Sequence, residues 1–295
     1  MKIHKKTKNV KYKRIRRQCN LNILIFERKP YIFRYMVDIL NKIIAHKKQE
    51  INTLKKIRTL KQMENAAKKT MFIPPKSFIN HLKKKFSIIA EIKKGSPSKG
   101  IIRSQFHPYS IARDYIEANV DAISILTDKK FFFGKSEYLK KIAKFSAVPL
   151  LRKDFIIDEY QIYESKYLGA NIILLIASVL PLSQLRDYLE LASELKMEVL
   201  TEVHTKKDLD KVLKTDASII GINNRNLKNF KIDLKKSVKL KSFIPKNRFT
   251  ISESGIHSID DIRLMRDSGF NGVLIGESFM RSKTIKKQVK LFQKG

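Results

Sequence analysis

The chain is 295 residues long and 43% of its residues are hydrophobic, which is enough to bury a sizeable core and excludes disorder for most of its length. It carries 62 Lys and Arg against 28 Asp and Glu, for a formal net charge of +34. This charge fits an anionic partner, such as nucleic acid or a membrane surface, or a solvated Lys-rich surface that needs no partner.

The cysteines and histidines argue against disulfides and metal sites. The single cysteine, Cys19, cannot form an intramolecular disulfide and indicates a reducing compartment. The six histidines lie far apart, without the spacing of metal ligands. No apolar run approaches the roughly 20 residues that span a bilayer. We therefore expect a cytoplasmic protein with neither a metal nor a membrane partner.

Residues 1–35 form a basic arm with seven Lys, five Arg and one acidic residue. Three interpretations compete for it: a nucleic-acid-binding tail, an organelle-targeting presequence, or sequence upstream of a start at Met36. The third is favoured, and we expect this arm to be disordered or absent from the working protein.

From Met36 onward, apolar residues such as Leu40, Ile43 and Ile51 recur at helical spacing, while Lys and Glu fill the other face. This pattern predicts an amphipathic helix over 36–70. The helix would lead into one domain that spans the rest of the chain.

Eight short β-branched runs follow, and most read as continuously apolar, as strands of a buried parallel sheet do. Polar stretches with helical spacing separate them, each long enough for a crossover helix. Eight βα units in one domain predict a (β/α)8 barrel over 36–295. An open doubly wound sheet, the alternative, usually has fewer strands and often a G-x-G-x-x-G turn, which is absent. The predicted strands are 86–92, 122–126, 148–151, 171–176, 198–202, 218–222, 248–252 and 272–275.

Polar residues follow nearly every predicted strand. In a closed barrel these strand ends meet at one mouth, where the active site lies. Converging lysines and glutamates would provide proton donors and acceptors, because opposite charges keep them ionised while burial moves some pKa values toward neutrality. The strand ends carry Glu91 and Lys93, Lys153, Glu202, Asn223 and Arg225, Glu253 and Ser254, and Gly276 and Glu277.

The last two strand ends also suggest an anion site. Ser254-Gly255 and Gly276 stand where barrels commonly bind a substrate phosphate through backbone N–H groups. Glu277 has the wrong charge for such a site unless its side chain turns away. The glycines of 95–100 have the spacing of a P-loop, but Ile101 follows where Lys is required, so that motif is rejected.

These residues carry a resemblance to a known family. The segment IAEIKKGSPSKG at 89–100 resembles the hallmark of the indole-3-glycerol phosphate synthase family, which are (β/α)8-barrel lyases with an amphipathic helix over the barrel mouth. Several motifs in order are far more specific than one. The further matching segments are 126–128, 131–134, 151–156, 200–204, 221–227, 251–256 and 274–277.

The resemblance implies an activity that needs no cofactor. The family's substrate, 1-(2-carboxyphenylamino)-1-deoxyribulose 5-phosphate, undergoes ring closure, decarboxylation and dehydration in tryptophan biosynthesis. By resemblance, Lys153 is the general acid, Lys93 holds the substrate carboxylate, and Glu202 stabilises positive charge and assists dehydration. The resemblance also implies that Glu91, Asn223, Arg225, Glu253 and Ser254 position substrate and lysines, that Phe132 contacts substrate, and that Ser96, Gly255, Gly276 and Glu277 lie in phosphate-binding segments.

The sequence departs from the family in three places. Lys135 stands where the family usually has Ser, Glu277 replaces a residue that is small in some relatives, and the basic arm before Met36 has no counterpart. Two other functions compete with the lead interpretation. A phosphoribosylanthranilate isomerase would be expected to use a Cys, but Cys19 lies outside the barrel. A nucleic-acid-binding protein would need a basic recognition helix or aromatic-interleaved motifs, which are absent. We expect a monomer that binds a small phosphorylated molecule and no nucleic acid.

Overall fold

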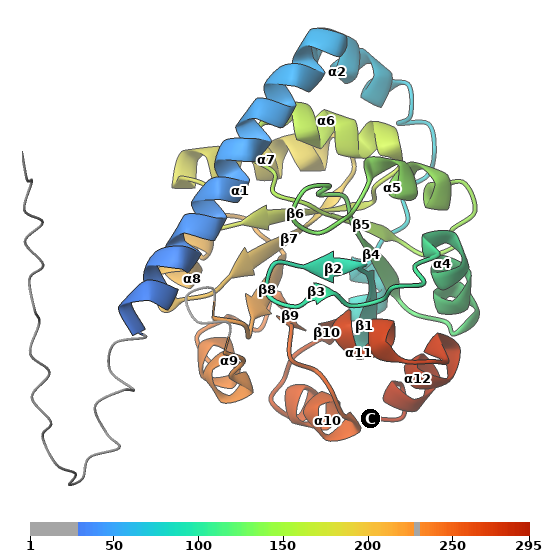
Figure 1. The fold of residues 1–295 in the computed structure, drawn as a ribbon, viewed down its shortest axis with the longest axis vertical. Helices are drawn as coiled ribbons and strands as arrows, with labels where there is room; N and C mark the ends of the chain where they lie inside the picture. The colour runs from blue at the N-terminus through green and yellow to red at the C-terminus, as the bar shows by residue number, and fades with distance from the viewer. Residues whose placement is uncertain (1–28, 227–230) are drawn as a thin grey trace, which may run out of the picture.

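A computed structural model describes residues 29–226 and 231–295, with side chains from residue 39 onward. Eight parallel strands form a closed barrel in the order β1-β10-β9-β8-β7-β6-β5-β4, with β4 returning to β1 (Figure 1). This confirms the predicted (β/α)8 barrel. Across the described residues, no helix is both long and apolar enough to cross a membrane.

Each barrel strand lies within two residues of its predicted position. The strands form because their side chains are buried on both faces, which suits β-branched residues. The bounds are β1 (Ser87–Ile92), β4 (Ala122–Leu126), β5 (Leu150–Lys153), β6 (Ile172–Ile176), β7 (Glu198–Val203), β8 (Ile219–Asn223), β9 (Phe249–Glu253) and β10 (Gly272–Ile275). The segment with P-loop-like spacing is instead an antiparallel hairpin of β2 (Gly95–Ser96) and β3 (Gly100–Ile101).

Helices surround the barrel and pack their apolar faces on the strands. Several begin at residues whose side chains accept a hydrogen bond from the first turn, such as Asp158, Thr205 and Ser258. Their bounds are α4 (Pro108–Glu117), α5 (Ser136–Ala143), α6 (Glu159–Leu168), α7 (Leu182–Glu194), α8 (Lys206–Val212), α9 (Leu234–Lys241), α10 (Ile259–Asp267), α11 (Glu277–Arg281) and α12 (Ile285–Phe292).

The leading segment forms two helices rather than the single one expected over 36–70. The long helix α1 (Lys29–Ile57) crosses the barrel obliquely, and α2 (Leu60–Lys68) packs on α6 (Figure 1). The break falls at Thr59, whose side chain accepts from the Gln62 N–H in a capping box. Because α1 begins at Lys29, it takes in the end of the predicted basic arm, and residues 1–28 of that arm lie outside the described residues.

The core has two layers. One lies between strands and helices, and the other fills the barrel interior. At the amino end of the interior, the short helix α3 (Ile79–Leu82) and the residue before it insert Phe78 and Leu82 among the strand side chains. Glu198, at the start of β7, accepts hydrogen bonds from the Phe78 and Ile79 N–H groups. The amino end is thereby filled, and the carboxyl end carries the cavity.

Candidate active site

A cavity opens at the carboxyl ends of the strands. Its side is closed by Ile39, Leu40 and Ile43, from the apolar face of α1. The helix therefore covers part of the mouth, as the family resemblance implied. All thirteen residues proposed from the sequence line this cavity: Glu91, Lys93, Ser96, Phe132, Lys153, Glu202, Asn223, Arg225, Glu253, Ser254, Gly255, Gly276 and Glu277.

Lys153 lies at the centre of the ionisable residues. Its Nζ is 2.9 Å from Glu202 Oε2 and 3.1 Å from Glu253 Oε2. We call these three residues the mouth cluster. Burial alone would lower the pKa of Lys153, but Glu202, Glu253 and nearby Glu91 outweigh it and raise that pKa above its ordinary value. The ammonium is therefore held protonated.

The two carboxylates of the mouth cluster have opposite shifts. Burial favours the neutral form of both, and at Glu253 it prevails together with repulsion from Glu202, so the pKa of Glu253 is raised. At Glu202 burial is outweighed by Lys153 and His204, so the pKa of Glu202 is lowered. One carboxylate thus stays ionised while its neighbour readily holds a proton, which is the division of roles that acid–base chemistry needs.

Glu91 and Lys93, at the end of β1, form an ion pair beside this cluster. Glu91 is buried, whereas Lys93 is only partly buried and reaches into the cavity. Two glycines make room for the carboxylates. A Cβ at Gly276 would overlap Glu91 Oε1, and a Cβ at Gly221 would overlap Glu253 Oε1. The buried charges therefore depend on missing side chains at these two positions.

The ends of β8 and β9 form a tightly turned rim. Asn223 Oδ1 accepts a hydrogen bond from the Arg225 N–H, while Asn224 Nδ2 donates to the Ser254 carbonyl oxygen at 2.6 Å. Ser254 and Gly255 have φ values of 67° and 81°. Two successive left-handed residues make the sharp turn that brings this backbone to the cavity, a conformation that costs energy for a non-glycine residue such as Ser254.

Glu277 is surrounded by cations at the rim. Its carboxylate lies 3.0 Å from Arg281 and 3.7 Å from both Lys99 and Arg225. Burial would raise the pKa of Glu277, but Arg281 and Lys99 outweigh it and lower that pKa. Three cations around one carboxylate leave the rim with a positive balance, so Glu277 does not prevent an anion from binding there.

The opposite side of the cavity is aromatic and apolar. Phe132, from the loop after β4, and Phe155, after β5, have ring centroids 5.9 Å apart and planes tilted by 41°. Leu40 and Ile43 of α1 line the same cavity. We call Phe132 and Phe155 the aromatic wall. A wall of this kind suits a flat apolar group, and the positive rim suits an anionic one.

Sequence reasoning missed several functional candidates. His204 Nε2 lies 3.2 Å from Glu202 Oε1, and burial lowers the pKa of His204. Asp128 and Asp154 are buried beside the cavity and both contact the buried Lys47 of α1. One signal for Lys47 was present: it stands four residues from both Ile43 and Ile51, on the apolar face of the helix.

These features define a class. The chain is a closed (β/α)8 barrel with a buried lysine–glutamate cluster at the carboxyl ends of its strands, which is where enzymes of this fold have their active sites. Solved structures that it resembles share little sequence identity with it. They include 3-hexulose-6-phosphate synthase from Salmonella typhimurium, with a TM-score of 0.58, 10% identity and coverage of 71% of this chain and 97% of that chain. Such a likeness supports the fold alone.

Relatives by sequence are more specific. A family model described as indole-3-glycerol phosphate synthase matches residues 40–292. The indole-3-glycerol phosphate synthase of Acetivibrio thermocellus is 44% identical over 257 residues, covering 86% of this chain and 99% of the relative. That of Legionella pneumophila strain Paris is 46% identical over 254 residues, covering 85% and 97%. The chain belongs to the indole-3-glycerol phosphate synthase family.

Proposed function

We propose that this protein converts 1-(2-carboxyphenylamino)-1-deoxyribulose 5-phosphate into indole-3-glycerol phosphate, carbon dioxide and water. One observation carries the proposal beyond family membership. Lys153 is held by two carboxylates in a cavity that has an aromatic wall on one side and a cationic rim on another. That arrangement matches a substrate with an aromatic ring at one end and a phosphate at the other.

The substrate's groups can be assigned to parts of the cavity. The phosphate is placed at the rim, against Ser96, Arg225 and the backbone of Gly255 and Gly276, because backbone N–H groups and a guanidinium favour anions. The anthranilate ring is placed on the aromatic wall. Its carboxylate is placed near Lys93, a partly exposed cation that lines the cavity.

Ring closure begins when the aryl carbon bearing the carboxylate attacks the ribulose carbonyl carbon. The nitrogen lone pair supplies electrons to the ring in this step, so that a positive charge is left on nitrogen. As this carbon–carbon bond forms, the carbonyl oxygen takes a proton from Lys153. An alkoxide is a stronger base than an amine, so this transfer proceeds even though the pKa of Lys153 is raised. Loss of carbon dioxide then returns its bonding electrons to the ring and neutralises the positive charge on nitrogen.

Dehydration completes the reaction. The new hydroxyl leaves as water after taking up a proton, positive charge returns to the ring nitrogen, and loss of a ring proton gives the indole. The ionised Glu202 is placed to stabilise that charge, because Lys153 and His204 keep the pKa of Glu202 low. Glu253, with its raised pKa, can take up and release a proton and so exchanges protons with Lys153 and Glu202 in the mouth cluster.

The test is direct because the chain has no Trp. Adding the substrate to the purified protein should produce rising indole fluorescence without a tryptophan background. Lys153→Ala, assayed at the same concentration, supplies the control for contaminating activity. A folded wild-type protein that gives no indole signal would overturn the proposal.

We also propose that the enzyme acts as a monomer in the cytoplasm. The support for the compartment is that the sequence has one cysteine, which indicates a reducing environment. The monomer is proposed because the cavity formed by this chain already holds the proposed acid and both carboxylates. Light scattering during size-exclusion chromatography measures the mass in solution, and a stable dimer would contradict the monomer.

A further inference from the structure

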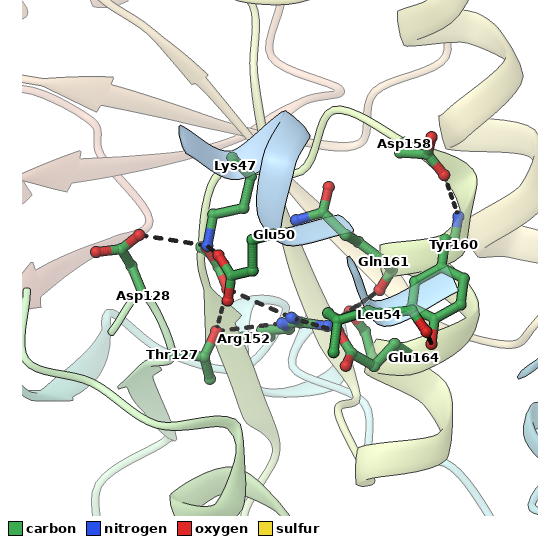
Figure 2. Close-up of polar contacts among 12 residues, drawn as sticks. Lys47, Glu50, Leu54, Thr127, Asp128, Arg152, Asp158, Tyr160, Gln161 and Glu164 are labelled. Carbon is green, nitrogen blue, oxygen red and sulfur yellow. Dashed lines mark hydrogen bonds and ion pairs between the residues drawn. The ribbon is translucent and has the colours of Figure 1, made fainter. Parts of the chain in front are cut away.

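Lys47 is a charged side chain buried between α1 and the barrel. It is 2% exposed, and its Nζ lies 2.7 Å from Glu50, 2.9 Å from Asp154 Oδ1 and 3.3 Å from Asp128 Oδ2. Figure 2 shows it reaching from the helix toward the ends of the strands. Burying an ammonium is costly unless it is paired, so this position needs the carboxylates it contacts.

Asp128 connects Lys47 to one half of the aromatic wall. Its Oδ1 accepts hydrogen bonds from the N–H groups of Phe131 and Phe132, at 2.7 Å and 3.1 Å. Its Oδ2 has no hydrogen-bond donor among the described residues, so the ion pair with Lys47 compensates its buried charge. The cation therefore fixes the carboxylate that shapes the loop carrying Phe132.

Asp154 connects Lys47 to the other half. Its Oδ1 also accepts from the Phe155 N–H at 2.8 Å, and its Oδ2 faces Thr127 and Arg152. Burial would raise the pKa of Asp154, but Lys47 and Arg152 outweigh it and lower that pKa to about 2. The carboxylate is thus fixed in its ionised form next to Lys153.

Arg152 anchors this arrangement in the barrel wall. Its guanidinium donates to Ser165 Oγ and to the Gln161 carbonyl oxygen, and it pairs with Glu164 at 2.7 Å (Figure 2). We call Lys47, Asp128, Asp154 and Arg152 the bracing cluster. It joins α1, the loop after β4, the end of β5 and α6 in one buried ionic network.

We propose that Lys47 is a positioning residue that sets the geometry of the aromatic wall and so determines how tightly the substrate's aryl group binds. The assignment of the aryl group rests on the proposed function. The geometry of the wall does not, because Lys47 reaches both Phe132 and Phe155 through one carboxylate each.

The chain offers a matched control on the same helix. Lys55 pairs with Asp158 at 2.8 Å, joining α1 to the start of α6, but both side chains are about a third exposed and neither lines the cavity. Lys47→Met removes the ion pairs of α1 with Asp128 and Asp154, whereas Lys55→Met removes the ion pair of α1 with Asp158. Only the first should affect the aromatic wall.

The kinetic test compares KM with kcat. Lys47→Met should raise KM about ten-fold and lower kcat by less, because the contact with the aryl group is made in both the ground state and the transition state. Lys55→Met should keep KM within about two-fold of wild type. An active Lys47→Met enzyme with the KM of Lys55→Met would overturn the inference.

Two further measurements keep the test decisive. Asp128→Asn keeps an acceptor for the N–H groups of the loop but loses the ion pair with Lys47, so it should also raise KM. The double variant of Lys47→Met and Asp128→Asn should have a KM no higher than that of Lys47→Met alone. Hydrogen exchange of the backbone amides in 128–134 needs no substrate. Exchange should accelerate in Lys47→Met and not in Lys55→Met, and unchanged protection would overturn the positioning role even if the proposed reaction proved wrong.

Discussion

The mouth cluster and the bracing cluster lie side by side and contain the same kinds of residues, yet their charges are arranged in opposite ways. In the mouth, one cation, Lys153, serves the carboxylates of Glu202 and Glu253. In the bracing cluster, one carboxylate, Asp154, is shared by Lys47 and Arg152. Burial and repulsion from Glu202 therefore raise the pKa of Glu253, whereas Lys47 and Arg152 outweigh burial and lower the pKa of Asp154.

The difference separates chemistry from support. A cluster with too few cations contains a carboxylate that can gain or lose a proton, and it faces the cavity where a substrate can alter the balance. A cluster with enough cations is fixed in one protonation state and holds its neighbours in place. The adjacent residues Lys153 and Asp154 belong to different clusters, since Lys153 is the last residue of β5 and Asp154 begins the loop after it.

The largest effects should come from the mouth cluster. Lys153→Ala and Glu202→Gln are each expected to reduce turnover at least ~10²-fold, the size typical of a positioned proton-transfer group. Steady-state indole fluorescence gives kcat, and circular dichroism confirms that the variants fold. Near-normal turnover in both variants would contradict the roles given to these residues.

The bracing cluster should affect stability first. Lys47→Met is expected to reduce the free energy of unfolding by about 2 kcal/mol near neutral pH, because Asp128 and Asp154 both lose a buried counterion and only Asp154 keeps a second one, Arg152. Urea denaturation, followed by circular dichroism, measures this loss. A loss as small as that of Lys55→Met would show that the cluster does not brace the fold.

This stability difference should depend on pH. The folded-state pKa of Asp154 is about 2, below its ordinary value of 3.8, so its contribution is fully present above the ordinary value and is lost as pH falls through about 2. The difference in the free energy of unfolding between wild type and Lys47→Met should therefore become smaller as the pH falls from 3.8 to about 2. A gap that stays constant from neutral pH to about pH 2 would mean that Asp154 does not carry it.

Gly221 provides a way to disturb the mouth without changing a charge. A Cβ there would overlap Glu253 Oε1, so Gly221→Ala should displace that carboxylate and reduce turnover about ten-fold. If the effect acts through Glu253, the double variant with Glu253→Gln should lose no more turnover than Glu253→Gln alone. Additive losses would place the effect of Gly221 elsewhere.

The smallest effect is expected at α5, which follows the loop that Asp128 organises. Lys135 is the N-cap of α5, has an extended backbone and makes no side-chain capping bond. Lys135→Ser should stabilise the protein by ~1 kcal/mol, because a hydroxyl can accept from the first turn and a cation at a helix N-terminus is unfavourable. If Lys47 rather than the N-cap of α5 orders the loop, the KM of Lys135→Ser should equal that of wild type. Thermal melting measures the change in stability, and steady-state kinetics measures KM.

The barrel and its mouth were predictable because they depend on local patterns. Apolar runs buried on both faces mark parallel strands, and parallel strands bring Lys153, Glu202 and Glu253 to one end. The division of the leading helix at Thr59 was less visible, although the Thr59-x-x-Gln62 capping box is a local signal. Continuous apolar spacing across that point concealed it.

The bracing cluster could not be predicted in the same way. Lys47 meets Asp128 and Asp154 across sequence separations of about eighty and a hundred residues, and only the packing of α1 on the barrel brings them together. The pKa shifts of Glu202 and Glu253 likewise depend on tertiary packing. Glu202 lies beside His204, which helps to lower its pKa, whereas burial dominates at Glu253 and raises its pKa. Residue types alone do not distinguish these two.

The inserted side chains of Phe78 and Leu82 determine by which route a substrate enters the active site and products leave it. Because they fill the amino end of the barrel, a molecule reaches Lys153 from the opposite end, past α1 and the rim. Carbon dioxide, water and the bulky product would then all leave through the same open end of the cavity by which the substrate entered. The order in which the products leave, and how long the last product stays in the opening, would set the turnover rate.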